Sequence, residues 1–360
     1  MLDSEINDIR HMNDFKGISF SKFKKRDVTK ELLNNLIKSK IEQSCYWSAE
    51  LICAGHYIDV WETILYFYSR YVHLGNPKIS IYLDVKFSKF KQIINNNCGN
   101  ELNLRNNNDI RELFCEIMCI LCDAKRKHCF ETIKITKDDF DITQMTGRLK
   151  ASNTQYANDI IREEDPKELF IPINELCFNL SDDSKNIIQC CYWIEWLIEF
   201  ESVCKNMKRI IKCDRRSNIP VDPKDQMDII WIVWDIFMKI SDTKTSIIQK
   251  IIKSLLSLFT VKYTNSGVKK RKYILFFIVS LLCEKIDLNE EIIRKEQKPI
   301  MLNILNKKDL IYKQIKKNEE FNDDYDDDFD KNKNKNTNLD KTIAKLETIN
   351  NFSDSFIPRI

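Results

Sequence analysis

A cysteine-rich stretch of the sequence contains the residue types that bind zinc. The stretch CEIMCILCDAKRKHC begins at Cys115 and places Cys119 and Cys122 in a C-x2-C arrangement, with His128 and Cys129 shortly after them. Structural zinc takes four nitrogen or sulfur ligands in a tetrahedron, so the last four of these residues are a candidate metal site. The three cysteines before His128 also recur at helical spacing among apolar residues, as on a buried helix face. We prefer this second interpretation and expect no cofactor.

The sequence contains none of the common catalytic motifs. A GxSxG nucleophile elbow, a P-loop, a GxGxxG loop and an HExxH metal motif are all absent, and each of these sites depends on its residue spacing. The four histidines, His11, His56, His73 and His128, stand in unrelated contexts. We therefore expect a protein that is not an enzyme, and a metal-dependent enzyme ranks behind binding and structural roles.

Basic residues are gathered in clusters that are candidates for contact with a polyanion. The stretch KNMKRIIKCDRR, from Lys205, contains arginines, which grip phosphate groups through paired hydrogen bonds. The other clusters are SKFKKR, AKRKH and VKKRK. The candidate residues for binding nucleic acid or another polyanion are Lys205, Lys208, Arg209, Lys212, Arg215, Arg216, Lys269, Lys270 and Arg271. The alternatives are an acidic protein surface, including this chain's own tail, and a solvated face without a specific partner.

Two similar aromatic stretches indicate the elements that carry these residues. QSCYWSAELI, from Gln43, and QCCYWIEWLI, from Gln189, are identical at six of ten positions. Apolar residues recur at helical spacing in both, and a helix with Trp61 follows the first copy while one with Trp231 and Trp234 follows the second. The pattern predicts a mainly α protein, a bundle of duplicated helical hairpins. The alternative is a chance similarity of two aromatic-rich helices.

Each copy also has a feature of its own. In the first, Glu50 lies in a nearly all-apolar helix, so its carboxylate should be paired or have a raised pKa. In the second, we expect the helix to continue to Arg216, before the two prolines of SNIPVDPKDQ break it. Residues 204–216 would then be a basic insertion that projects from the helical body.

A small β element is expected between the two copies. Residues 79–87 alternate apolar and polar side chains, the period of two that a half-buried strand requires. Residues 129–135, which follow a predicted helix over about 109–125, and residues 168–176 are further candidate strands. We expect them to form a two- or three-stranded element beside the helices.

The chain divides by composition into five parts. They are a basic N-terminal arm (1–28), a first helical repeat with the β element (29–180), a second repeat with the basic insertion (181–312), a disordered acidic linker (313–338) and a tethered amphipathic helix (339–360). The linker is predicted from eight acidic residues between Glu319 and Asp330, with little apolar surface to bury. Leu339, Ile343, Leu346 and Ile349 share one face of the last helix, which would dock on a viral or host protein or fold back on the body.

The overall composition favours a folded protein in a reducing compartment. Hydrophobic residues make up 43% of the 360 residues and aromatic residues 11%, enough for a large core. Thirteen cysteines, with no apolar signal segment at the start, favour free thiols. The longest apolar run, 11 residues from Tyr273, is shorter than the roughly 18 residues that span a bilayer. We therefore expect no membrane partner.

Three stretches carry a resemblance to a known family. QSCYWSAELICAGHYIDVWETILYFYSRYVHLGNP, RLKASNTQYANDIIREEDPKELFIPINELCFNLSDD and CCYWIEWLIEFESVCKNMKRIIKCDRRSNIPVDPKDQMDIIWIVWDI resemble a conserved, uncharacterised family of nucleocytoplasmic large DNA viruses, over most of residues 30–310. The resemblance implies a viral origin and a location in the host cytoplasm or viral factory, and it transfers no catalytic residues. The first stretch is also similar to the helical collar of clamp-loader-like ATPases, but no Walker motif precedes it.

These observations lead to one expected function and one alternative. We expect a non-enzymatic accessory factor of viral DNA replication or transcription, which holds nucleic acid or partner proteins on a helical scaffold. The alternative is a structural or packaging-associated protein of the virion.

Overall fold

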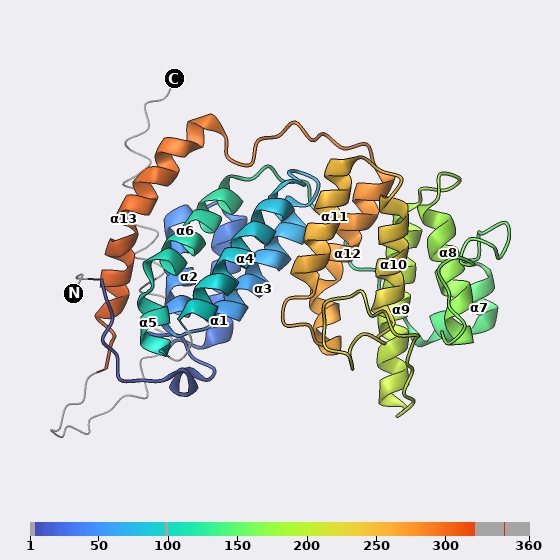
Figure 1. Cartoon of the computed structure of the whole chain (residues 1–360), viewed down its shortest axis with the longest axis horizontal. Helices are drawn as coiled ribbons and strands as arrows, with labels where there is room; N and C mark the ends of the chain where they lie inside the picture. Colours follow the sequence, from blue (N-terminus) through green and yellow to red (C-terminus); the bar gives the residue numbers. More distant parts are fainter. Residues whose placement is uncertain (1–3, 98–99, 321–341, 343–360) are drawn as a thin grey trace. The chain divides into compact units, whose positions relative to one another are not determined.

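The computed structural model describes residues 4–97, 100–320 and 342, and these residues are mainly helical (Figure 1). The helices are α1 (Lys25–Ile37), α2 (Ile41–Cys53), α3 (Tyr57–Phe67), α4 (Ile79–Asn96), α5 (Glu101–Asn106), α6 (Asn108–Asp123), α7 (Ile142–Thr146), α8 (Phe170–Leu180), α9 (Ile187–Asn206), α10 (Ile230–Ser241), α11 (Ser246–Phe259), α12 (Val268–Cys283) and α13 (Lys298–Lys316). A π-helical turn, Tyr68–Val72, continues α3. The prediction of a mainly α protein is confirmed.

The chain forms two compact units, each assembled from separated stretches. Unit 1 comprises Met1–Thr63, Lys89–Asp123 and Ile293–Ile360, and unit 2 comprises Ile64–Ser88 and Ala124–Ile292. The sequence predicted one helical repeat over residues 29–180 and a second over 181–312, one for each aromatic stretch. The two observed units have other boundaries, because the chain passes from unit 1 to unit 2 within α3 and returns to unit 1 within α4.

The core of unit 1 is built around α2. This helix packs against α1, α6 and α13 (Figure 1), and its residues from Gln43 to Cys53 are all buried. Trp47 is 1% exposed, and its ring meets the ring of Tyr46 edge to face at 5.1 Å. Gly55, directly after the helix, has a φ of +75°, a conformation that favours glycine, so the chain reverses there into α3.

The core of unit 2 is built around α9 and α12. α9 packs against α8, α10 and α12, and α11 packs against α10 and α12. Asn186 caps the start of α9 by accepting a hydrogen bond from the backbone N–H of Gln189 at 3.1 Å. Trp193, Trp231 and Trp234 are each 0% exposed. The aromatic residues of the second copy are therefore interior residues, like those of the first.

The strand expected at residues 79–87 is wrong: the segment is the first half of α4. Ile79, Leu83, Phe87 and Phe90 are buried along one face at helical spacing, whereas Val85 is 62% exposed. The alternation of period two was real, but the same residues also hold an apolar stripe of period 3.6. The helix runs on to Asn96, and this longer stripe decides the structure.

The other two expected strands are also wrong, and no β-strand occurs in the part of the chain that the structure describes. Residues 129–135 form an irregular segment whose first backbone N–H, that of Cys129, donates to the carbonyl oxygen of Arg70 at 2.8 Å. Residues 168–176 fold into a 3₁₀ turn and α8. Two isolated β-bridges occur in this part of the chain, Ile18 with Lys24 and His73 with Lys127.

The N-terminal stretch, expected to be an arm, is packed into unit 1 over its described residues. Phe15 and Phe20 are 0% exposed. Arg10, which stacks on both rings, donates to Asp8 at 2.6 Å, and its carbonyl oxygen accepts a hydrogen bond from Arg105 of α5 at 2.7 Å. Buried aromatic and ionic contacts thus make the stretch part of the core.

The start of the expected acidic linker is ordered. α13 continues to Lys316, and residues 317–320 then pair with the N-terminal stretch. The backbone N–H of Ile9 donates to the carbonyl oxygen of Glu320 at 3.2 Å, and the Glu320 carboxylate forms an ion pair with Lys22. Residues 321–338 and the predicted C-terminal helix, apart from Thr342, lie outside the described residues.

Candidate functional site

The nine basic residues expected to bind a polyanion all belong to unit 2, but their exposure differs. The exposed ones are Lys205, Lys208, Arg209, Lys212, Arg215, Lys269 and Lys270. Arg216 and Arg271 are buried, at 0% and 5% exposure. The guanidinium of Arg271 donates to the carbonyl oxygen of Phe259 at 2.5 Å. Two of the nine residues are therefore structural and are removed from the candidate surface.

Arg216 holds the end of the basic insertion through a buried ion-pair network. Its guanidinium donates to the two carboxylate oxygens of Asp165 at 2.5 and 2.7 Å and to Asp235 at 3.0 Å. The side chains of Arg216 and Asp165 are both 0% exposed. Burial opposes ionisation of Asp165, but the hydrogen bonds from Arg216 outweigh it and lower the pKa of this carboxyl group. Arg216 is thus the anchor of the insertion and not a contact for a ligand.

From the last two residues of α9 to this anchor, residues 205–215 form a mostly exposed segment, which we call the basic tip. The expected continuation of α9 to Arg216 is wrong, because α9 ends at Asn206 and Lys208 has a φ of +59°. After the tip, the chain returns to the body where the backbone N–H of Cys213 donates to the carbonyl oxygen of Met227 at 2.9 Å. The tip is therefore a loop with a fixed base.

The basic tip combines free positive charge with exposed apolar side chains. Met207 and Ile210 are 74% and 84% exposed, the highest values for large hydrophobic residues in the described part of the chain. Lys205, Lys208 and Lys212 are exposed around them, and none of the three forms an ion pair within that part. Such a surface offers both charge and apolar area to a partner.

Two of the remaining exposed candidates are paired with carboxylates. Arg209 forms an ion pair with Glu168, and Lys269 forms one with Glu199 of α9 at 2.7 Å. Arg215 donates to the amide oxygen of Gln226 at 2.6 Å. Lys270, at the start of α12, is exposed. Within the described residues, charge without a carboxylate partner therefore remains on the three lysines of the basic tip, on Arg215 and on Lys270 of α12. The Lys212 ammonium also donates to the carbonyl oxygen of Lys224 at 3.1 Å.

A second basic site lies in unit 2, at a pocket of about 310 Å³. Four cations line it: Lys125, Arg126, Lys127 and Lys285. Acidic groups offset much of this charge, since Glu290 lies 3.8 Å from Lys125 and Glu284 forms an ion pair with Lys127. The cluster AKRKH was a sequence signal for this pocket, but its residues were not among the nine candidates.

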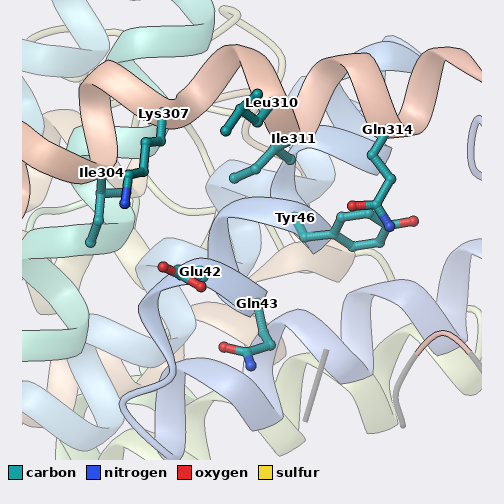
Figure 2. A pocket seen from close by; sticks show the side chains of 8 residues that line it. All are labelled: Glu42, Gln43, Tyr46, Ile304, Lys307, Leu310, Ile311 and Gln314. Atoms are coloured by element: carbon teal, nitrogen blue, oxygen red, sulfur yellow. The ribbon is translucent and has the colours of Figure 1, made fainter. Parts of the chain in front are cut away.

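A mainly apolar pocket of about 220 Å³ lies in unit 1, between α2 and α13 (Figure 2). Ile304, Leu310 and Ile311 reach down from α13, and Tyr46 of α2 lies below them. Sequence reasoning missed this pocket because it exists only where two helices far apart in the chain pack together. It combines an apolar wall with few polar groups, which is typical of small-ligand sites.

The carboxylate of Glu50 is buried and hydrogen-bonded, as the sequence predicted. It accepts hydrogen bonds from the hydroxyls of Ser19 at 2.9 Å, Ser21 at 2.5 Å and Tyr46 at 3.3 Å. Burial raises the pKa of Glu50, and these donors oppose the shift without cancelling it. The group ties the N-terminal stretch to α2, which is a structural role.

A pair of carboxyl groups in unit 2 was not anticipated. Glu201, near the end of α9, accepts a hydrogen bond from Asn265 at 2.8 Å, and Asp228 accepts one from Tyr263 at 2.9 Å. Burial, with the nearby charge of Asp228, raises the pKa of Glu201 to about 7, and burial also raises the pKa of Asp228. Neither residue lines either of the two pockets described above.

The candidate zinc ligands do not lie together, but three cysteine thiols do. In the described part of the chain, the metal-ligating side chains that lie together are Cys45, Cys115 and Cys119, with their sulfur atoms within 4.8 Å of one another. The Cys122 sulfur lies 3.5 Å from the hydroxyl oxygen of Ser44. The backbone N–H of Cys129 bonds to Arg70, and the His128 ring packs against Tyr71 at 5.3 Å. The structure therefore does not bring together the candidate set of Cys119, Cys122, His128 and Cys129, which ranked behind the buried helix face. Helical spacing places Cys115 beside Cys119 on α6, and the packing of α2 adds Cys45.

Across the described residues, no helix is both long enough and apolar enough to cross a bilayer. In comparisons with family models, curated proteins and solved structures, no match to the chain was found.

Proposed function

We propose that the protein is a non-enzymatic accessory factor of viral DNA replication or transcription that binds nucleic acid through the basic tip. The observation that carries this proposal is the set of exposed lysines, Lys205, Lys208 and Lys212, which have no ion pair within the described residues. Cations of this kind bind phosphate groups and release counterions into solution. The viral setting rests on the sequence resemblance and remains a prediction.

The anchoring of the tip supports this role. A flexible chain loses conformational entropy when it binds, which reduces its affinity. Here the base of the tip is held by the Arg216–Asp165 pair and by the backbone pairing of Cys213 with Met227. The lysines therefore project from a fixed point, as a contact surface requires.

The test is a binding titration of labelled single-stranded and double-stranded oligonucleotides, followed by fluorescence anisotropy at several salt concentrations. The variant Lys205→Glu/Lys208→Glu/Lys212→Glu should bind at least about tenfold more weakly. The salt dependence of log K should become shallower by about 0.9 for each duplex phosphate contact that is lost.

A control variant separates the tip from the general charge of unit 2. Lys250, Lys253 and Lys262 are also exposed lysines of this unit, and their replacement by Glu changes the net charge by the same amount. We expect this variant to keep most of the affinity. Equal weakening by both variants would mean that binding is nonspecific, and no binding by the wild-type chain would reject the proposal.

A structural or packaging-associated virion protein is the second candidate, and the exposed Met207 and Ile210 favour it. Apolar side chains that are 74% and 84% exposed in a charged surrounding mark a contact with another protein more often than one with phosphate. The variant Met207→Ser/Ile210→Ser separates the two candidates. It should leave oligonucleotide binding intact, whereas a virion role predicts loss of incorporation into particles.

We also propose that the two aromatic stretches are duplicated packing units that give the scaffold its two cores. Tyr46 and Trp47 in unit 1, and Tyr192 and Trp193 in unit 2, each form an edge-to-face ring pair with 5.1 Å between centroids. Both tryptophans are buried. The matched geometry supports a common origin, which further sequences related to this chain would test.

A further inference from the structure

Three cysteine thiols meet between two helices of unit 1. Cys115 and Cys119 are one turn apart on α6, so their side chains lie on the same face. Cys45 faces them from α2, with 3.5 Å between its sulfur and that of Cys115. All three sulfur atoms lie within 4.8 Å of one another. We call this group the thiol trio.

The spacing of the trio fits a metal ion bound by three thiolates. A metal–sulfur bond of about 2.3 Å places the sulfur atoms of a trigonal site about 4.0 Å apart. The separations in the trio, from 3.5 Å to at most 4.8 Å, bracket this value. Small rotations of the cysteine side chains are therefore enough to form the site, and α2 and α6 need not move apart.

A positively charged residue on a third helix acts on the trio. The charge of Lys308 is felt at Cys115. Lys308 belongs to α13, which packs on both α2 and α6. A cation beside the trio offsets part of the negative charge that three thiolates would bring into a buried site.

The number and type of the ligands select the metal. Zinc in structural sites takes four ligands, but the group found in the described residues contains three sulfur donors and no histidine or carboxylate. The three cysteines are only 3% to 4% exposed, which leaves little room for a water ligand. Soft thiolate ligands select Cu(I), zinc and iron–sulfur clusters. Of these, Cu(I) is the ion whose coordination is completed by three sulfur ligands.

We propose that Cys45, Cys115 and Cys119 form a three-coordinate site for a soft monovalent metal ion, Cu(I). On binding, each thiol that still carries a proton releases it to solvent, three metal–sulfur bonds form, and no electron is transferred. The ion would join α2 to α6 inside unit 1. This site is independent of the basic tip, which belongs to unit 2.

The test is an anaerobic titration of the reduced full chain with Cu(I) in the presence of a Cu(I)-specific chelator. We expect one equivalent to be retained against the chelator, with ultraviolet thiolate-to-copper charge-transfer absorption and a raised melting temperature. The variant Cys45→Ser/Cys119→Ser should lose all three signals. Cys53→Ser is the matched control, because Cys53 is a buried cysteine of α2 outside the trio, and it should retain them.

A measurement on the wild-type chain covers the case in which the double variant fails to fold. X-ray absorption at the copper edge should show three sulfur neighbours at about 2.3 Å. Two sulfur neighbours, or nitrogen or oxygen in the shell, would overturn the assignment. So would retention of copper by a folded double variant, loss of copper in Cys53→Ser, or a preference of the trio for zinc over Cu(I).

Discussion

Arg216 and Asp165 form a two-point ion pair that solvent does not reach. Both side chains are 0% exposed, and the two hydrogen bonds measure 2.5 and 2.7 Å. This pair joins residues 51 positions apart in the chain and closes the base of the basic tip. An arginine of a basic cluster is therefore used inside the protein, while the lysines that precede it remain outside.

The first prediction concerns the removal of this arginine. Arg216→Ala should lower the free energy of unfolding by about 3 to 5 kcal/mol, because it leaves the Asp165 carboxylate buried without its partner. Denaturant unfolding of unit 2 measures the change. Arg209→Ala is the control: its ion pair with Glu168 is exposed, so the expected loss is at most about 1 kcal/mol. Similar losses in both variants would contradict the internal role of Arg216.

The second prediction concerns acid stability and His73. This residue is 1% exposed, and burial, together with the nearby Lys127, lowers its pKa to about 3. An unfolded histidine has a pKa of about 6.5. Between these values the unfolded state binds a proton that the folded state does not, so stability falls as the pH falls through this window.

His73→Asn should reduce this loss by about 1.4 kcal/mol for each pH unit below about 6.5. Asparagine is suitable because His73 has a φ of +48°, and asparagine tolerates positive φ better than most residues. Urea unfolding from about pH 4 to about pH 7 compares the two proteins. Parallel curves for both would show that His73 does not titrate with unfolding.

The third prediction has the opposite sign and concerns Glu201. Its pKa is raised to about 7 by burial and by the charge of Asp228, so between about pH 4.5 and 7 the folded state holds a proton that the unfolded state has lost. This contribution disappears as the pH rises. Glu201→Gln should therefore gain stability relative to the wild type on going from pH 5 to pH 8.

The control for Glu201 is Glu199→Gln on the same helix. Glu199 forms a partly exposed ion pair with Lys269, so its replacement removes a carboxylate from the same helix and leaves the buried Glu201 in place. Thermal unfolding at several pH values measures both variants. If Glu201→Gln parallels the wild type at every pH, the two carboxyl groups do not interact as described.

The fourth prediction concerns Gly75 beside the basic pocket. A Cβ atom at this position would lie 2.2 Å from the carbonyl oxygen of Lys125, so Gly75→Ala must displace the backbone of Lys125 or that of Gly75. We expect a loss of about 1 to 3 kcal/mol in stability and altered amide resonances for residues 125–127. Gly147→Ala, whose nearest contact would be 3.7 Å, should be within about 0.5 kcal/mol of the wild type.

The sequence predicted best those features that depend on one helix at a time. The helical character of the stretch from Gln43 and the buried state of Glu50 each follow from residues close together in the chain. The apolar pocket and the thiol trio needed the packing of helices that are distant in sequence, and the Glu201–Asp228 pair needed a turn to fold back on α9. No local pattern contains that information.

The two main errors have definite physical causes. Residues 79–87 satisfy both a period of two and a period of 3.6, and the continuation of the apolar stripe to Phe90 and beyond favours the helix. The basic stretch after Asn206 was expected to extend α9, since nothing before the prolines stops a helix there. Instead, the ion pairs of Arg216 with Asp165 and Asp235 hold the end of the basic tip against unit 2, and the segment before it is a loop.

The passage of the chain through α3 and α4 from one unit to the other limits how the protein can be divided. The chain enters unit 2 within α3, leaves it within α4 and enters it again at Ala124. No single break in the polypeptide can therefore separate the two units from each other. A cut after Ile292, for example, takes α13 away from unit 1 and leaves all of unit 2 on the same fragment as the rest of unit 1, so damage at the C-terminal side falls on one core while the other stays whole.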